Sequence, residues 1–156
     1  MRIQDYFIET TQRGVDELFR YAAAVPADKL DWAPEGGRST LDICREVALT
    51  PEWAVTTMRG DDFDFNEETF AKVKEMQSGW TTVEQCKAEY DKRAGALNEF
   101  YKNLPDEKLK TTRVLPFVNN KEFTMVEMAE YPSWNANYHT GQIAYIQTLL
   151  GDKGMY

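Results

Sequence analysis

Apolar residues recur at intervals of three and four along most of the chain, and this spacing predicts helices. Between residues 3 and 24 they fall on one helical face, and the pattern stops before Pro26, which disfavours helical backbone at Val25. A second apolar stripe begins after Ser39, a residue type that accepts hydrogen bonds from the free N–H groups of a helix start. The stripe resumes beyond Pro51, so we expect a bend at this residue rather than the end of the helix.

The third long helix has the most regular spacing. Its apolar residues follow in steps of three and four up to Pro105, and Thr81 with Glu84 matches a capping box at its start. The acidic stretch that precedes it is expected to be a connecting segment, in which Asn66 starts a short helix that runs to about Gln77. This segment leaves room for a crossover between the second and third long helices.

A fourth long helix is predicted near the end of the chain. Thr124 and Glu127 fit a second capping box, and the apolar pattern runs on to Leu150. Pro132 is expected to kink this helix in its second turn. Before it, residues 114–124 hold β-branched and aromatic side chains around two adjacent asparagines, which tolerate left-handed turns, so we expect a small hairpin or an ordered loop.

These elements predict an all-α fold. We expect an antiparallel four-helix bundle with a short extra helix between helices two and three and a small hairpin or loop before helix four. The length of 156 residues suits one domain, residues 1–156, at ~100–200 residues per domain. Cys44 and Cys86 are expected as free thiols in the core, as is usual in a reducing compartment.

Charge and composition exclude several classes of function. Lys and Arg number 18 against 26 Asp and Glu, and the net charge of −8 repels phosphate backbones and acidic lipid surfaces. We therefore expect neither a nucleic-acid nor a membrane partner. No run approaches the ~20 apolar residues that span a bilayer, and the N-terminus lacks the apolar core of a secretory signal, so we expect a cytoplasmic protein.

The only histidine of the chain, His139, limits the metal chemistry that is open to it. A site that needs two or three imidazoles from one chain is excluded. Asn135 precedes His139 by four residues, so the two project from one helical face, and Gln142 continues that face. Such a pair can hold a metal or a polar ligand, but from the spacing alone a hydrogen-bonded histidine at a helix contact is the simpler interpretation.

Three segments carry a resemblance to a known family. WNANYHTGQIAYIQTLLGD resembles the last helix of the DinB-like superfamily, WAPEGGRSTLDICREVA its loop and second helix, and LPFVNNKEFTMVEMA its loop into the last helix. The resemblance implies a DinB/YfiT-like bundle, often dimeric, which usually holds zinc or nickel through three histidines. Characterised relatives include thiol-dependent transferases and isomerases that act with low-molecular-weight thiols such as bacillithiol or mycothiol.

Carried over by position, the three metal ligands implied by this resemblance fall on Glu46, Asn135 and His139. Only one imidazole remains, and an amide and a carboxylate are poor replacements at a zinc site, so zinc or nickel is expected to bind weakly if at all. We favour a closed hydrogen-bond network of the three side chains in place of a metal. Three nearby aromatic residues are expected in the core or in a groove wall: Trp53, Trp134 and Tyr138.

The sequence leaves three functions open. The first is a small-molecule or thiol-binding protein with a modified, one-histidine site, the second a metal-dependent thiol S-transferase or hydrolase-like enzyme, and the third a dimeric protein-interaction bundle. A homodimer is expected, because Gly141 leaves a notch on the last helix and the chain has 4 Trp, 8 Tyr and 8 Phe. A glycine inside a helix costs about 1 kcal/mol relative to alanine, so Gly141 also predicts a close approach of neighbouring backbone.

Overall fold

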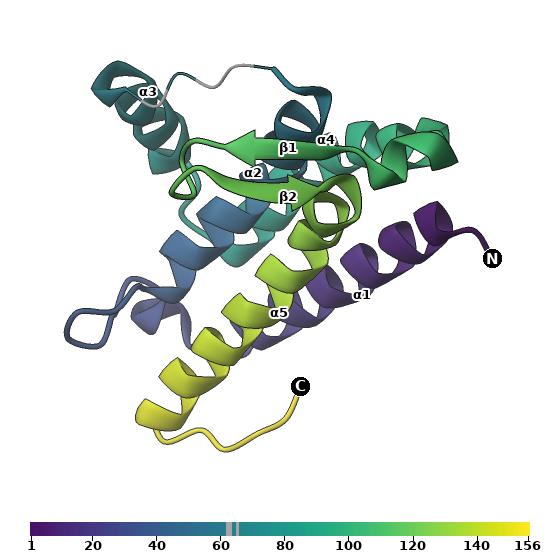
Figure 1. The fold of residues 1–156 in the computed structure, drawn as a ribbon. Helices are drawn as coiled ribbons and strands as arrows, with labels where there is room; N and C mark the ends of the chain where they lie inside the picture. Colours follow the sequence, from purple (N-terminus) through teal and green to yellow (C-terminus); the bar gives the residue numbers. More distant parts are fainter. Residues whose placement is uncertain (62–63, 65) are drawn as a thin grey trace.

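Helices make up most of the computed structural model, which describes residues 1–61, 64 and 66–156 (Figure 1). The four long helices are α1 (Ile3–Ala23), α2 (Thr40–Arg59), α4 (Val83–Asn103) and α5 (Met125–Leu149). The shorter elements are η1 (Ala27–Lys29), α3 (Glu67–Ser78), η2 (Asp106–Lys110), β1 (Thr112–Leu115) and β2 (Lys121–Thr124). The predicted all-α four-helix bundle, with its extra helix and small hairpin, is confirmed.

The long helices pack in pairs. Helix α1 lies along α5, α2 lies along α4, and α2 also contacts α5. Figure 1 shows the two-stranded hairpin above the upper end of α5 and α3 set apart from the bundle. Three residues of the predicted acidic connecting segment, Asp62, Phe63 and Phe65, lie outside the described residues.

The inward face of α4 follows the predicted periodicity. Cys86, Tyr90 and Leu97 are buried, and Ala94 is half-buried against the same core. Cys44 of α2 is buried as well, and neither cysteine forms a disulfide, as the sequence predicts. Among the described residues, no helix is both long enough and apolar enough to cross a lipid bilayer.

Local side-chain caps fix where the helices begin. Ser39 accepts a hydrogen bond from the N–H of Asp42 at the start of α2, and Thr124 with Glu127 forms the predicted capping box of α5. At α4 the prediction is wrong by one residue. The box is formed by Thr82 and Gln85, because Gln85 Oε1 accepts the backbone N–H groups of both Thr81 and Thr82, at 2.7 and 3.1 Å.

Proline and glycine positions give mixed outcomes. Pro51 lies inside α2, which continues to Arg59, and Pro132 lies inside α5. The turn residues Asn119 and Asn120 have φ of 52° and 54°, the left-handed conformation expected of the hairpin. The close approach predicted at Gly141 is wrong: a Cβ atom there would meet nothing within 4 Å, because this residue sits on the exposed face of α5.

Candidate functional site

The central contact of the candidate site joins α5 to α2. His139 Nε2 lies 3.0 Å from Glu46 Oε1, and His139 Nδ1 lies 2.6 Å from the side-chain oxygen of Gln142. The His139 side chain is only 5% exposed, whereas that of Glu46 is 38% exposed. Each ring nitrogen therefore has a side-chain oxygen within hydrogen-bond distance, and the structure brings together two of the three residues that the sequence selects.

Asn135 takes part in a neighbouring set of contacts. Its side-chain nitrogen donates to Thr50 Oγ1 at 3.3 Å, and its side-chain oxygen accepts from Tyr131 O–H at 3.4 Å. Thr50 in turn donates to the backbone carbonyl of Glu46 at 3.5 Å. Within the described residues, no hydrogen bond joins Asn135 directly to the Glu46 or His139 side chain, so the predicted closed network is linked only through the α2 backbone.

Arg38, which the sequence analysis does not select, completes the surroundings of Glu46. Its guanidinium pairs with Glu46 Oε2 and also donates to the carbonyl of Asp42 at 3.1 Å. Burial raises the pKa of Glu46, but hydrogen bonds from His139 and Arg38, with their charges, outweigh burial and lower this pKa to about 2. Glu46 is therefore ionised at neutral pH, with a partner on each oxygen.

These donors do not fit a tight zinc or nickel site. The one imidazole has no free nitrogen, and Asn135 is engaged with Thr50. The guanidinium of Arg38 also places a fixed positive charge against the carboxylate that would bind the cation. In the part of the chain that the structure describes, no group of three or more His, Cys, Asp or Glu side chains could hold a metal ion.

Glu46 and Arg38 lie on the wall of a large cleft. The cleft has a volume of about 1220 Å³ and is enclosed by α2, α3, the hairpin and the first half of α5. Its aromatic lining comes from all four elements: Trp53, Phe70, Phe117, Phe123, Tyr131 and Trp134. Trp53 and Trp134 thus form a groove wall as predicted, whereas Tyr138 lies outside the lining, 52% exposed and stacked on Trp134 at 5.3 Å between ring centroids.

The chain is thus a four-helix bundle in which a small hairpin leads into the last long helix and a polar pair joins that helix to the second. Its structure is similar to that of YfiT from Bacillus subtilis, described as a probable metal-dependent hydrolase with an unusual four-helix bundle topology. The TM-score is 0.77 at 13% sequence identity, over 96% of this chain and 88% of YfiT.

A second similar structure is an uncharacterized protein from Clostridium difficile 630, with a TM-score of 0.67 and 8% identity over 94% of this chain and 96% of that one. At these identities the likeness shows the fold, and it confirms the predicted resemblance at that level. No family model matches the chain, and no curated protein matches its sequence.

Proposed function

We propose that the chain is a small-molecule binding protein that keeps a DinB-like cleft and holds a hydrogen-bonded Glu46–His139 pair where the resemblance implies a metal. The observation that carries the proposal is that both ring nitrogens of His139 and both carboxylate oxygens of Glu46 have protein partners. A site whose carboxylate and imidazole are already paired with each other and with neighbouring side chains has no open ligand position for a metal, which favours binding over metal-assisted catalysis.

The lining of the cleft indicates the class of ligand. Aromatic side chains on facing elements, such as Trp53 of α2 and Trp134 of α5, suit a flat apolar body. Arg38 keeps donors beyond those used for Glu46 and Asp42, so it can receive one acidic group of the ligand. An aromatic carboxylate therefore fits best, and a low-molecular-weight thiol with acidic groups belongs to the same class.

The enzyme alternative, a metal-dependent thiol S-transferase or hydrolase-like activity, would require Glu46, Asn135 and His139 to give up their present partners and hold zinc or nickel. The description of YfiT as a probable metal-dependent hydrolase supports this alternative only through the shared fold. The free-energy cost of leaving Arg38 unpaired beside a divalent cation argues against it. Elemental analysis of natively purified protein separates the two functions.

We also propose a homodimer, formed through an exposed aromatic face of α5. This α5 face consists of Trp134, Tyr138, Tyr145 and Leu149, which are 58%, 52%, 61% and 47% exposed. Their spacing places them on one side of the helix, with the open position of Gly141 among them. Large exposed apolar patches mark interaction surfaces, and a second copy of the chain would cover this one.

We place this function in the cytoplasm. Cys44 and Cys86 are both free and buried, which is typical of a reducing compartment. Burial raises the pKa of both thiols, that of Cys86 to about 11, so neither is an activated nucleophile for thiol chemistry.

The binding proposal is tested by tryptophan fluorescence with 1-naphthoate as probe and neutral 1-naphthol as its match. Trp53 and Trp134 line the cleft, whereas Trp32 and Trp80 do not. We expect naphthoate to quench the emission saturably, Trp53→Leu to weaken binding about tenfold or more, and Trp32→Leu to leave the affinity unchanged. Equal binding by the Trp53→Leu variant, or no saturable response to naphthoate, would contradict the proposed function.

A further inference from the structure

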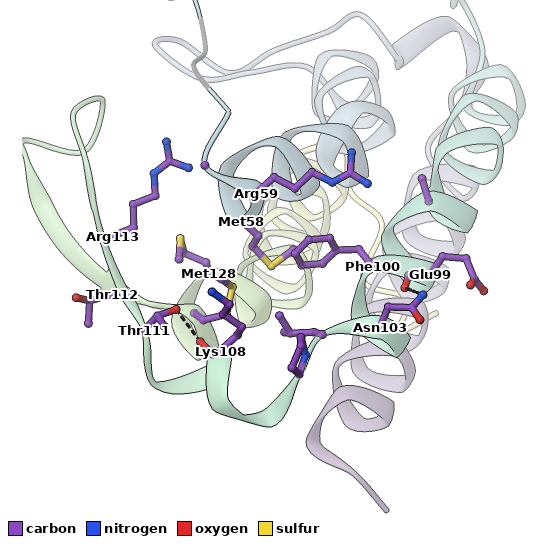
Figure 2. A pocket seen from close by; sticks show the side chains of 15 residues that line it. Met58, Arg59, Glu99, Phe100, Asn103, Lys108, Thr111, Thr112, Arg113 and Met128 are labelled. Carbon is purple, nitrogen blue, oxygen red and sulfur yellow. Dashed lines mark hydrogen bonds between the residues drawn. The ribbon is translucent and has the colours of Figure 1, made fainter.

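A second cavity opens at the end of the bundle where α2 and α4 finish (Figure 2). It has a volume of about 680 Å³ and is bounded by these helix ends, by η2, by the start of β1 and by the start of α5. Its apolar lining is made of buried or half-buried side chains: Met58, Phe100, Leu104, Met125 and Met128. Only Met128 also lines the cleft of the proposed function, so this is a separate space.

Three cations surround this apolar lining. Arg59, Lys108 and Arg113 all line the cavity, and Figure 2 shows them on different sides of the labelled methionine and phenylalanine side chains. Arg113 is held in place, because its Nη1 donates to the carbonyl of Thr57 at 2.6 Å. Gly60 makes room for this contact: a Cβ there would lie 3.1 Å from Arg113 Nη1.

The cations at this cavity have no ion-pair partner in the part of the chain that the structure describes. Among the described residues of the lining, Glu99 is the one carboxylate, and it is paired with Lys102 at 2.8 Å. The whole chain carries a net charge of −8, so its overall composition does not predict a group of three cations around one cavity. Arg113 keeps guanidinium donors beyond the one given to Thr57, and Lys108 and Arg59 are exposed.

We propose that this second cavity binds an amphipathic carboxylate, whose acidic group is attracted by the combined positive charge of Arg59, Lys108 and Arg113 at the rim and whose aliphatic chain lies among the methionines. Cavities of about 300–1,000 Å³ hold small organic ligands, and methionine adapts its shape to flexible apolar chains. A guanidinium binds a carboxylate in a paired geometry that a neutral head group does not reproduce. The ligand is therefore selected by its charge as well as by its apolar body.

The first test is calorimetric titration of the full chain with sodium decanoate below its micelle concentration, with decanol as the neutral match. We expect decanoate to bind at least about tenfold more tightly than decanol. The double variant Arg59→Gln/Lys108→Gln should lose this preference and keep the binding of decanol. Lys153→Gln, at a cation outside both cavities, serves as the matched control and should bind both compounds as the wild type does.

The second test locates the ligand through the methyl resonances of ¹³C-methionine. Decanoate should shift Met58 and Met125, which line only this cavity, and leave Met76 of α3 unchanged. Trp53→Leu should not alter decanoate binding, which separates this site from the cleft of the proposed function. Equal affinity for decanoate and decanol, no effect of the double charge variant, or shifts confined to other methionines would overturn the proposal.

Discussion

His139 Nε2 of α5 lies 3.0 Å from Glu46 Oε1 of α2, so one polar contact joins the last long helix to the second. The sequence predicts, from a resemblance to DinB-like proteins, that a metal ligand lies at each of these positions. Here the carboxylate faces a guanidinium on its other oxygen, and the imidazole faces Gln142 on its other nitrogen. These contacts thus occupy the side-chain atoms that would otherwise coordinate a metal. The contact between His139 and Glu46 also connects α5 to α2.

The Glu46 contacts should be visible in the pH dependence of folding. The pKa of Glu46 is lowered from 4.5 to about 2 in the folded chain, so its contribution to stability is complete above about pH 4.5 and is lost as the pH falls through about 2. Glu46→Gln cannot ionise. It should lower the free energy of unfolding at pH 7 by about 1 kcal/mol and flatten its decline between pH 4.5 and 2, as measured by urea denaturation.

Glu35→Gln is the matched control for this experiment. Glu35 lies exposed in the loop before α2, and its side chain forms no ion pair with the described residues. This variant should keep the wild-type pH profile. If Glu46→Gln kept that profile as well, the contacts with His139 and Arg38 would not form in solution.

The metal prediction is that the wild type holds zinc or nickel too weakly for either to contribute to stability. Treatment with EDTA should leave the melting temperature unchanged, since a dependent domain would lose the free energy of metal binding. Glu46→His/Asn135→His, which with His139 supplies three imidazoles, should gain stability with added zinc, by about 2.7 kcal/mol at a concentration 100-fold above its Kd.

Glu46→His/Asn137→His is the control for the engineered zinc site, because Asn137 is exposed on another side of α5. It should gain no more zinc affinity than Glu46→His alone. A large fall in the melting temperature of the wild type with EDTA would reject the hydrogen-bond interpretation. No zinc gain in the first double variant would show that the residue-by-residue correspondence with the family is wrong.

Local spacing predicts part of this site and not the rest. The i, i+4 relation of Asn135 and His139 and the position of Gln142 follow from helix geometry, which the sequence shows directly. The contact of Arg38 with Glu46 cannot be predicted from sequence periodicity. Arg38 lies in the loop before α2, and the path of that loop brings it to Glu46. The cleft depends on α3 and the hairpin meeting α2 and α5, which is a tertiary relation.

The fold was easier to predict because its signals are local. Caps such as Ser39 and Thr124 act within one turn, and apolar periodicity marks the buried face of each helix. The start of α4 is the exception, because Thr81 and Thr82 are adjacent and each lies three residues before a side chain that can accept its backbone N–H. The backbone decides between them, and Thr82 takes the extended conformation of the N-cap, with φ of −130°.

Removal of each threonine hydroxyl in turn should show whether Thr81 or Thr82 forms the capping box of α4. Thr82→Ala deletes the acceptor of the Gln85 N–H bond and should lower the free energy of unfolding by about 1 kcal/mol. Thr81→Ala keeps that bond and should cost clearly less, because the N–H of Thr81 still donates to Gln85. Urea denaturation of both variants measures their losses in the free energy of unfolding. Equal losses would contradict the assignment of the capping box to Thr82.

The last prediction concerns the homodimer proposed through the α5 face. Gly141→Arg places a long charged side chain at an open position, where a Cβ meets nothing within 4 Å, so the monomer should fold normally. Gly95→Arg on α4 is the matched control, because its Cβ also meets nothing within 4 Å. Both replacements raise helix propensity by up to about 1 kcal/mol, so a loss of assembly in one variant alone reports the interface.

Light scattering at micromolar concentration measures the outcome. The wild type and Gly95→Arg should have twice the 18.0 kDa mass of the chain, whereas Gly141→Arg should have the mass of one chain. Such a dimer should bury at least ~1,000 Å² in total, which a charged side chain at the middle of the α5 face would oppose by its desolvation cost. A monomeric wild type across this range would reject the dimer, and a dimeric Gly141→Arg would place the interface on another face of the bundle.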